Sequence, residues 1–446
     1  MTAGRPEPAG ASRRPRVLFI SADPVGERMA GLGIRYWELA RALGPHAEVT
    51  LAHGGTGAQT TEGVTTLPYR PHAPAALREP IARADVIVTH PQWPLVTRWL
   101  RQARARVIFD LYDPETLETL ELLAGRPPLA RRQLTATTLD RLHAALRTGH
   151  HFMCASEKQR DLWLGAMLAL RLIGPETYDR DPDLRGTIDL VPFGLPDRPP
   201  AEGDGGARAA ISSIPDDAEI VLWNGGLWSW LDADSAIRAV AGLAERRPRV
   251  RLVFMGGAAE HPAAASSTAA AIALARELGV FGTVVHFHDR WVPYADRGAW
   301  LTGADCAVPT HREHLETRFA FRTRLLDCFW AGLPVVCTSG DALADLVASD
   351  GLGAVVAPGD VDGLAAAMAQ VLDRGKPAYQ PALAATAATH TWALAARPLL
   401  RWISQPDAPR PGDAAGMLRP PLAQRLREAI YLGGVREALA RRAGPG

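Results

Sequence analysis

The sequence predicts an α/β protein made of two doubly wound domains that face each other across a cleft. The first observation is that short apolar segments, typical of buried strands, alternate with longer segments of helical periodicity. The second is that this alternation stops at residues 196–210, which are rich in proline, glycine and charge, and then starts again. Each half is therefore expected to be a Rossmann-like unit, a parallel sheet with helices on both faces.

The bulk composition excludes several classes of protein. With 446 residues the chain is long enough for two or three domains, and its 49 basic and 48 acidic residues leave a net charge of +1. That balance creates no overall field that would attract nucleic acid. No apolar run approaches the roughly 18 residues that cross a bilayer, and the first residues lack the apolar core of a secretory signal.

The four cysteines favour a reducing compartment. Each of Cys154, Cys306, Cys328 and Cys337 lies in an apolar stretch, and no two of them form a CxxC pair. Buried free thiols are therefore favoured over disulfides or a zinc site. We expect a cytoplasmic protein without a bound metal.

The predicted organisation has five parts: a leader (1–15), a first domain (16–195), a linker (196–210), a second domain (211–395) and an extension (396–446). Strands are expected in the first domain at 16–21, 47–52, 84–90, 105–113, 152–156 and 187–194, with a helix at 31–44. In the second domain strands are expected at 219–226, 250–257, 284–289, 305–310, 333–338 and 353–358. Helices are expected there at 232–248, 266–280, 295–304, 322–332, 341–351 and 360–375. Residues 422–442 have the pattern of an arginine-bearing amphipathic helix that is solvated or crosses between domains, with docking to a membrane surface or a partner as the alternative.

The loops that leave the first domain's strands carry candidate acceptor-side residues. Gly31 and Gly33 would let a ligand approach backbone amides at a helix start, and Arg35 in the first turn favours an anion there, although a plain tight turn explains the glycines equally well. His90 follows one strand and is either structural or a catalytic group. Asp110 ends another strand, and Asp113 follows in the same loop. Capping of the next helix explains Asp113, but it does not explain Asp110.

The second domain offers candidate donor-binding residues at four places. Gly225, Gly226 and Trp228 follow a strand, and the tryptophan is either a core anchor or a platform for a base or sugar. Arg290 and Val292 lie in a strand-end loop, 290–294, that could clasp a base through its backbone. Arg322, Thr323 and Arg324 open a helix, where two cations are unfavourable unless a diphosphate lies there. Asp327 is either an ion-pair partner of Arg324 or an acceptor for ribose or sugar hydroxyls.

Several stretches together resemble a known family. RLLDCFWAGLPVVCTSGD (324–341) is similar to the acidic-helix-plus-GLPVV element of GT-B glycosyltransferases of the retaining family 4 type. RVLFIS with GLGIRYWELARAL, IDLVPFGLP, VRLVFMGG and GLGAVVAPGDVDGLAAAM follow the same family's order, so the resemblance covers about residues 16–395. The sequence departs from the family in two respects. Asp327 and Phe319 occupy the positions of the family's two glutamates, and the loop GGLWSWLD (225–232) lacks the Arg and Lys with which the family holds the donor's diphosphate.

The resemblance implies a glycosyltransferase that moves a sugar from a UDP, GDP or dTDP donor to a hydroxyl of a small molecule or glycan, with retention and without a metal or other cofactor. Arg322, Arg324 and Arg35 would hold the diphosphate in place of the missing pair, and His90 and Asp110 would act on the acceptor. The alternatives are a non-catalytic GT-B protein that binds nucleotide sugars, and a phosphorylase- or epimerase-like GT-B enzyme. The sequence predicts no oligomeric state.

Overall fold

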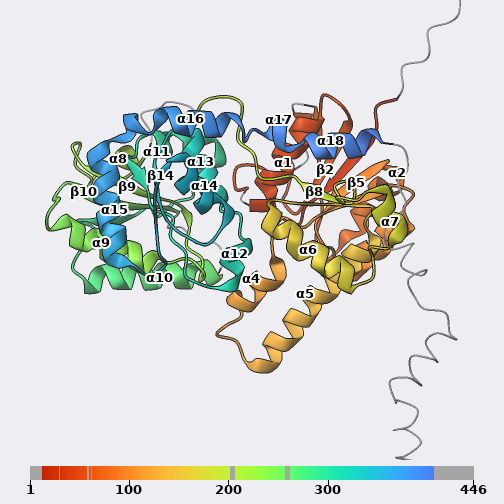
Figure 1. The fold of residues 1–446 in the computed structure, drawn as a ribbon, viewed down its shortest axis with the longest axis horizontal. Helices are drawn as coiled ribbons and strands as arrows, with labels where there is room; N and C mark the ends of the chain where they lie inside the picture. The colour runs from red at the N-terminus through yellow and green to blue at the C-terminus, as the bar shows by residue number, and fades with distance from the viewer. Residues whose placement is uncertain are drawn as a thin grey trace, which may run out of the picture.

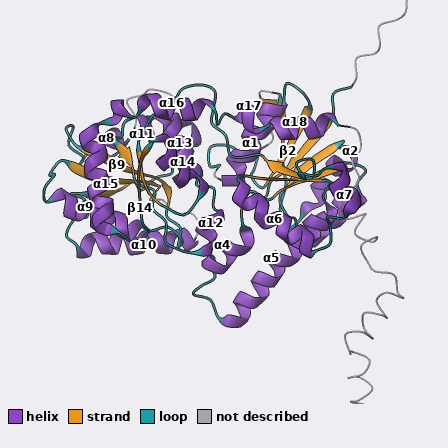
Figure 2. Cartoon of the chain, viewed as in Figure 1, coloured by secondary structure: helices purple, strands orange, loops and turns teal. Residues whose placement is uncertain are grey.

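Two parallel sheets form the cores of two separate lobes. The computed structural model describes residues 13–29, 31–57, 60–61, 63–200, 206–256 and 262–405. Within this part, each sheet is a central layer with helices on both faces, as Figure 2 shows in orange and purple. The predicted fold class, two doubly wound α/β domains, is confirmed.

The first sheet has the strand order β3-β4-β2-β1-β5-β6-β7-β8. Its strands are β1 (Arg16–Ile20), β2 (Glu48–His53), β3 (Thr60–Thr61), β4 (Val64–Pro68), β5 (Val86–Thr89), β6 (Arg106–Asp110), β7 (His151–Cys154) and β8 (Ile188–Leu190). All neighbours are parallel except β3, which pairs with β4 in the antiparallel sense. The sequence VIVT of β5 is buried along its whole length, because helices cover both faces of the sheet.

The second sheet has the strand order β11-β10-β9-β12-β13-β14, and the pairs along it are parallel. Its strands are β9 (Glu219–Gly226), β10 (Val250–Gly256), β11 (Val285–Phe287), β12 (Cys306–Ala307), β13 (Val335–Thr338) and β14 (Gly353–Val356). All four cysteines are free and buried, as expected from their apolar surroundings.

The helices cover both faces of the sheets (Figure 1). Those of the first lobe are α1 (Gly31–Leu43), η1 (Pro74–Leu77), α2 (Arg78–Arg83), α3 (Pro94–Gln102), α4 (Glu115–Leu122), α5 (Pro128–Thr148), α6 (Glu157–Ala169) and α7 (Pro175–Arg180). Those of the second are α8 (Ala207–Ala210), α9 (Ala233–Ala244), α10 (Pro262–Glu277), η2 (Tyr294–Asp296), α11 (Arg297–Thr302), α12 (Leu315–Phe319), α13 (Thr323–Trp330), α14 (Ala342–Asp350), α15 (Val361–Arg374), η3 (Lys376–Ala378) and α16 (Gln380–Ala388). Every helix in the described residues is too short or too polar to traverse a lipid bilayer.

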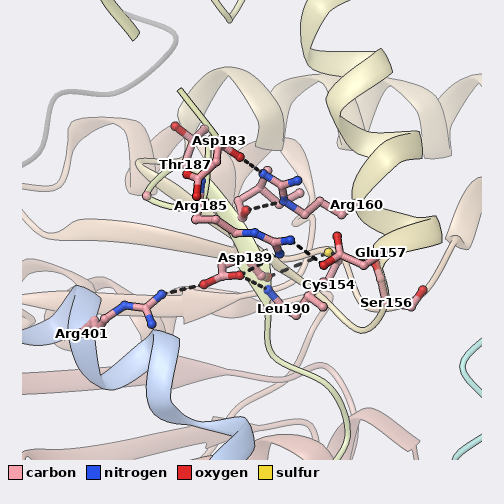
Figure 3. Close-up of polar contacts among 12 residues, drawn as sticks. Cys154, Ser156, Glu157, Arg160, Asp183, Arg185, Thr187, Asp189, Leu190 and Arg401 are labelled. Carbon is pink, nitrogen blue, oxygen red and sulfur yellow. Dashed lines mark hydrogen bonds and ion pairs between the residues drawn. The ribbon is translucent and has the colours of Figure 1, made fainter. Parts of the chain in front are cut away.

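The last two described helices, α17 (Trp392–Ala395) and α18 (Arg397–Ser404), cross back to the first lobe. Figure 1 shows them in blue beside the red and orange elements that begin the chain. Arg401 Nη2 of α18 lies 2.6 Å from Asp189 Oδ2 of β8, and Arg185 Nη1 lies 3.1 Å from Asp189 Oδ1 (Figure 3). The extension therefore begins as part of the first lobe, while the amphipathic helix expected at 422–442 lies outside the described residues.

Each sheet has one point where the strand order reverses. In the first sheet β1 lies between β2 and β5, and in the second β9 lies between β10 and β12. The loops that leave the two strands on either side of such a point diverge, which opens a crevice at the carboxyl edge of the sheet. In the first sheet this edge carries residues 21–29 and 90–93.

Some elements differ from the prediction. The strands β3 and β4 and the short helix α12 were not expected, and the expected linker ends in α8. The predicted helix 322–332 is observed as Thr323–Trp330, with Arg322 as its N-terminal flanking residue. The strand expected at 305–310 is paired only at Cys306–Ala307.

Candidate active site

A cavity of about 580 Å³ lies between the two lobes at the carboxyl edge of the first sheet. The loops after β1, β5 and β6 supply most of its wall, and the loop after β9 supplies Trp228 and Trp230 from the second lobe. Its polar and aromatic lining includes Asp23, Tyr69, His90, Gln92, Trp93, Asp110, Tyr112, Asp113, Glu115, Glu118, Arg141, Trp163, Trp228 and Trp230. The cavity therefore collects His90, Asp110, Gly31 and Trp228 among the residues that the sequence singled out.

His90 lines the cavity as an uncharged imidazole. Burial lowers its pKa to about 3, and the nearby Arg141 adds to that effect. Gln92 Nε2 lies 3.2 Å from His90 Nε2, and the ring of Tyr36 lies beside the imidazole with 6.5 Å between ring centroids. A neutral ring of this kind can accept or donate a hydrogen bond and position a hydroxyl, but it is a weak base.

Asp110 and Arg35, expected in separate roles, are paired with each other. Arg35 Nε donates to Asp110 Oδ2 at 2.6 Å and Nη2 donates to Oδ1 at 3.1 Å, with both side chains almost fully buried. Arg35 Nη2 also donates to the carbonyl of Val191 at 2.7 Å. This geometry contradicts the expectation that Arg35 binds a diphosphate, and it leaves Asp110 poorly placed as a base, because both of its oxygens already accept hydrogen bonds.

The glycines at the start of α1 have different roles. Gly31 lines the cavity, and its role toward a ligand stays a prediction. At Gly33 a Cβ atom would lie 2.4 Å from the carbonyl oxygen of Pro24, so the close approach there is to the chain itself. Gly33 is therefore required by packing, which corrects its expected role toward a ligand.

Trp228 and Trp230 form a stacked pair at the cavity. Their ring centroids are 5.2 Å apart and the ring planes differ by 8°. Neither indole belongs to the fully buried core, and both are open to the cavity. An apolar face of a sugar ring or a cation can pack on such a surface.

The amino end of α13 carries polar atoms without partners. Arg324 Nη2 donates to the carbonyl of Gly226 at 3.0 Å, while Arg324 Nη1 is enclosed and has no hydrogen-bond partner. Asn224 Oδ1 and His311 Nδ1 are enclosed and unpartnered as well. Burial lowers the pKa of Arg324 to about 10, because no carboxylate compensates its charge. A charge in this position is expected to have an anionic ligand.

Gly225 and Gly226 leave room for that guanidinium. Gly225 has a φ of +136°, and a Cβ atom there would lie 3.3 Å from Arg324 Cζ. A Cβ atom at Gly226 would lie 3.8 Å from Trp228 Nε1. The glycine loop thus connects Arg324 to the tryptophan pair, and hence to the cavity between the lobes.

Arg322 does not share the surroundings of Arg324, because it is paired with a carboxylate. Its Nη2 atom lies 2.5 Å from Asp341 Oδ2, and both side chains are at most 1% exposed. Asp341 Oδ1 caps α14 by accepting from the amides of Leu343 and Ala344. The expectation that Arg322 grips a diphosphate is therefore contradicted, because its charge is already neutralised inside the second lobe.

The other residues of α13 make contacts that the sequence did not predict. Asp327 Oδ1 accepts from Arg297 Nε at 3.1 Å, so its ion-pair partner is Arg297 and not Arg324. Arg297 is in turn stacked between the rings of Tyr294 and Trp330. Thr323 shares a hydrogen bond with the side chain of Tyr112, which joins the opening of the helix to the first lobe.

Arg290 and Val292 line a separate, more open cavity of about 340 Å³ beside α8. The Arg290 side chain is 82% exposed and lies 3.9 Å from the equally exposed carboxylate of Asp289. Trp291 Nε1 donates to the carbonyl of Glu27 in the first lobe at 3.1 Å. The structure thus does not bring Arg290 and Val292 together with the cavity between the lobes.

Three carboxyl groups at the boundary between the lobes were not selected from the sequence. Burial raises the pKa of Glu118 to about 8, with further contributions from Glu316 and Glu115. Burial also raises the pKa of Glu316 to about 7, and its Oε2 atom has no hydrogen-bond donor. Asp113 lines the cavity, and desolvation and the charges of Glu118 and Asp110 raise its pKa. From the sequence, Asp113 was interpreted as a helix cap. Glu118 and Glu316 are far apart in the sequence and come close only where the two lobes meet, so no sequence motif indicates that they belong together.

A comparison with protein families matches residues 218–374 to glycosyl transferases group 1. This match covers the second lobe, which contains α13, the glycine loop and Arg324. No curated protein sequence matches the chain.

Solved structures with the same fold extend over both lobes. WaaG, a glycosyltransferase involved in lipopolysaccharide biosynthesis, is 19% identical with a TM-score of 0.56, and the match covers 91% of this chain and 100% of WaaG. Sucrose-phosphate synthase from Thermosynechococcus elongatus is 17% identical with a TM-score of 0.61, covering 87% and 98% of the two chains. HepE from Anabaena, in complex with UDP-glucose, is 13% identical with a TM-score of 0.62, covering 87% and 99%.

These similarities define the class of protein. The arrangement of the two lobes is the GT-B fold, and the second lobe is a glycosyl transferases group 1 domain. The chain thus has the fold of GT-B glycosyltransferases and carries a glycosyl transferases group 1 domain over residues 218–374, the part that contains the motif RLLDCFWAGLPVVCTSGD (324–341).

Proposed function

We propose that this enzyme transfers a sugar from a nucleotide diphosphate sugar to a hydroxyl of an acceptor held in the cavity between the lobes. The observation that carries the proposal is Arg324, an enclosed cation with an unpartnered Nη1 atom at the amino end of α13. A diphosphate there would receive hydrogen bonds from the guanidinium and from the first amides of the helix, with the helix dipole adding to the attraction. Asn224 and His311 add unpartnered polar atoms to the same region.

UDP is our first choice of donor nucleotide, with GDP and dTDP as the other candidates. HepE has the same fold and binds UDP and UDP-glucose. The cleft side of the second lobe offers the glycine loop for close approach of the phosphates. We place the reaction in the cytoplasm, since all four cysteines are free and buried thiols.

In this proposal the bond between the anomeric carbon and the phosphate oxygen breaks, and the acceptor oxygen bonds to that carbon with retention. Arg324 and the amide groups of α13 stabilise the negative charge that develops on the leaving diphosphate, which is the role a metal ion has in other transferases. His90 positions the acceptor hydroxyl, whose proton passes to the departing phosphate. Domain contact around the cavity keeps water from the donor.

Calorimetric titration of the whole protein with UDP, GDP and dTDP tests the donor site, and mass spectrometry of donor hydrolysis or transfer tests the chemistry. Arg324→Ala should lower transfer by about 100-fold or more, as loss of one charge-stabilising donor typically does. Arg324→Lys should recover part of that loss, and the exposed Arg238→Ala on α9 should change nothing. Full activity in Arg324→Ala would refute the proposal.

One observation favours a second candidate, a GT-B protein that binds nucleotide sugars without transferring them. Phe319 and Asp327 replace the family's glutamates, and Asp327 is already paired with Arg297. Under this alternative the nucleotide binds and depends on Arg324, yet neither hydrolysis nor transfer occurs with any of the three nucleotide sugars. A phosphorylase would instead require free phosphate for turnover.

A further inference from the structure

The cavity between the lobes holds more carboxyl groups than cations. Two of its five acids are neutralised within the chain: Asp110 by Arg35 at 2.6 Å, and Glu115 by Arg141 at 2.7 Å. The remaining three, Asp23, Asp113 and Glu118, make no ion pair with any residue in the described part of the chain. With the cavity's histidine uncharged, the ionisable groups that remain there without a partner are all carboxyl groups.

The three unpaired acids come from different elements. Asp23 follows β1 and accepts a hydrogen bond from the amide of Gly33, Asp113 follows β6, and Glu118 lies on α4. Desolvation is the largest cause of the raised pKa of all three, and the guanidinium of Arg35 offsets it only in part at Asp113. These acids come from three parts of the fold and surround one cavity. A cation that enters the cavity would favour their ionised forms.

A buried hydroxyl group behind the cavity wall is also unsatisfied. Tyr36 is 0% exposed, and its hydroxyl oxygen has no hydrogen-bond partner. That hydroxyl interacts electrostatically with Asp110, Asp113 and Tyr69, all of which line the cavity. Tyr36 does not itself line the cavity, but its ring lies beside that of His90, which does. A buried phenol without a partner is uncommon, so the polar groups of this wall are not fully satisfied within the chain.

The aromatic walls of the cavity suit the same ligand. The stacked indoles of Trp228 and Trp230 approach from the second lobe, and Tyr69 and Tyr112 from the first. A neutral sugar could pack on these rings, but it would leave three unpaired carboxyl groups around it. An ammonium group would satisfy both the acids and the ring faces.

We propose that the acceptor bound in this cavity carries a protonated amine, as amino sugars and aminocyclitols do. The inference rests on the proposed function in one respect: it names the class of acceptor that binds at the same site. Its physical content, a preference of the cavity for an ammonium over a hydroxyl or an acetamide on the same ring, is a property of binding alone and needs no turnover.

The test uses three probes that share one ring: D-glucosamine, D-glucose and N-acetyl-D-glucosamine. Their binding to the whole protein is measured by ligand-observed NMR, with and without UDP. Glucosamine should bind at least about 10-fold more tightly than either neutral probe at pH 7, and added salt should reduce the difference. Equal binding of the three probes, or no binding of any of them, overturns the inference.

Variants assign the preference to the acids. Glu118→Gln and Asp113→Asn should each reduce the preference for glucosamine to about 3-fold or less, whereas the exposed Asp362→Asn on α15 should preserve it. Thermal unfolding of each variant checks that it is folded. If Asp113→Asn does not fold, Glu118→Gln, which keeps the shape of the side chain, is enough to test the inference. A preference that survives in a folded variant overturns the inference. Loss of UDP binding, with the amine preference intact, would instead count against the proposed function.

Discussion

Arg322 and Arg324 are two residues apart, yet their surroundings assign them different roles. Arg322 forms a buried ion pair with Asp341, whereas the buried guanidinium of Arg324 has no carboxylate partner among the described residues. Removing one member of a buried pair leaves the other charge uncompensated, which typically costs about 3–5 kcal/mol. Substitution of Arg324 leaves no carboxylate uncompensated, since its reported hydrogen bond goes to the carbonyl of Gly226, so the change should affect ligand binding more than folding.

Arg322→Ala should therefore lower the free energy of unfolding by about 3–5 kcal/mol, measured by urea denaturation. The double variant Arg322→Met with Asp341→Asn should recover much of that loss, because no charge then remains buried alone and the asparagine still caps α14. Asp373→Asn is a matched control: Asp373 pairs with Arg247 but is 70% exposed, so its loss should cost about 1 kcal/mol or less. An unchanged stability in Arg322→Ala would show that the pair is not formed in solution.

Glu118 should make stability depend on pH. Its pKa of about 8 in the folded state exceeds the roughly 4.3 of an unfolded glutamate, so the folded state binds the proton more tightly. The contribution to the free energy of unfolding is then complete below about pH 4.3 and is lost as the pH rises through about 8. Glu118→Gln stays uncharged, and its stability should fall less between pH 5 and pH 8.5.

Urea denaturation across this range checks that expectation. The matched control is Glu245→Gln at the exposed end of α9, which should follow the wild-type pH dependence. Identical slopes for wild type and Glu118→Gln would mean that Glu118 titrates normally and that the lobes do not enclose it.

At the scale of the element, β8 and α18 show how the extension is held. Asp189 accepts from Arg401 of α18, from Arg185 and from the amide of Leu190, so one carboxylate joins three segments (Figure 3). Asp189→Ala should loosen α18 without releasing it, because Trp402 and Ile403 remain buried, and hydrogen exchange should show moderately faster exchange at residues 397–404 with little change in β9 to β14. The exposed Asp161→Ala on α6 is a suitable control.

The pattern of burial explains which elements could be predicted. Strands such as β5 and β13 are buried along their whole length because both faces are covered, and their mostly apolar sequences carry that signal directly. Helix α12 has five residues, and β3 has two, which is too short for a period to repeat. The fold class was therefore predictable, while these short elements depend on the packing around them.

The site was predictable only in part, and the reason is distance along the chain. Strand-end loops carry His90, Asp110 and Trp228, and topology alone brings those loops to one edge. The pairs that decide which charges remain available join Arg35 to Asp110 and Arg322 to Asp341, across 75 and 19 positions. No local pattern specifies such a pairing, so a sequence shows where charges gather but not which of them neutralise each other.

At the scale of the whole molecule, two neighbouring residues of α6 contact the second lobe, and one of their side chains is buried while the other is exposed. Gln159 on α6 is 0% exposed, and its Nε2 atom donates to the carbonyls of Tyr112 at 2.6 Å and Phe319 at 2.8 Å, one in each lobe. Its neighbour Lys158 also bridges the lobes, at 2.8 Å from Asp345, but both of those side chains are exposed to solvent. Burial should make the first contact the stronger one.

Gln159→Leu should therefore open the molecule. It leaves the buried carbonyl of Phe319 without this donor, which costs about 1–3 kcal/mol and shifts an equilibrium between closed and open lobes by roughly 5- to 150-fold. We expect a larger radius of gyration in small-angle scattering without ligand, and a higher KM for the donor with a smaller change in kcat, because binding energy would be used to close the lobes. Lys158→Ala, the matched control, should leave scattering and KM near their wild-type values. If both variants scatter like the wild type, the lobes are held by other contacts and the cavity between them does not depend on Gln159.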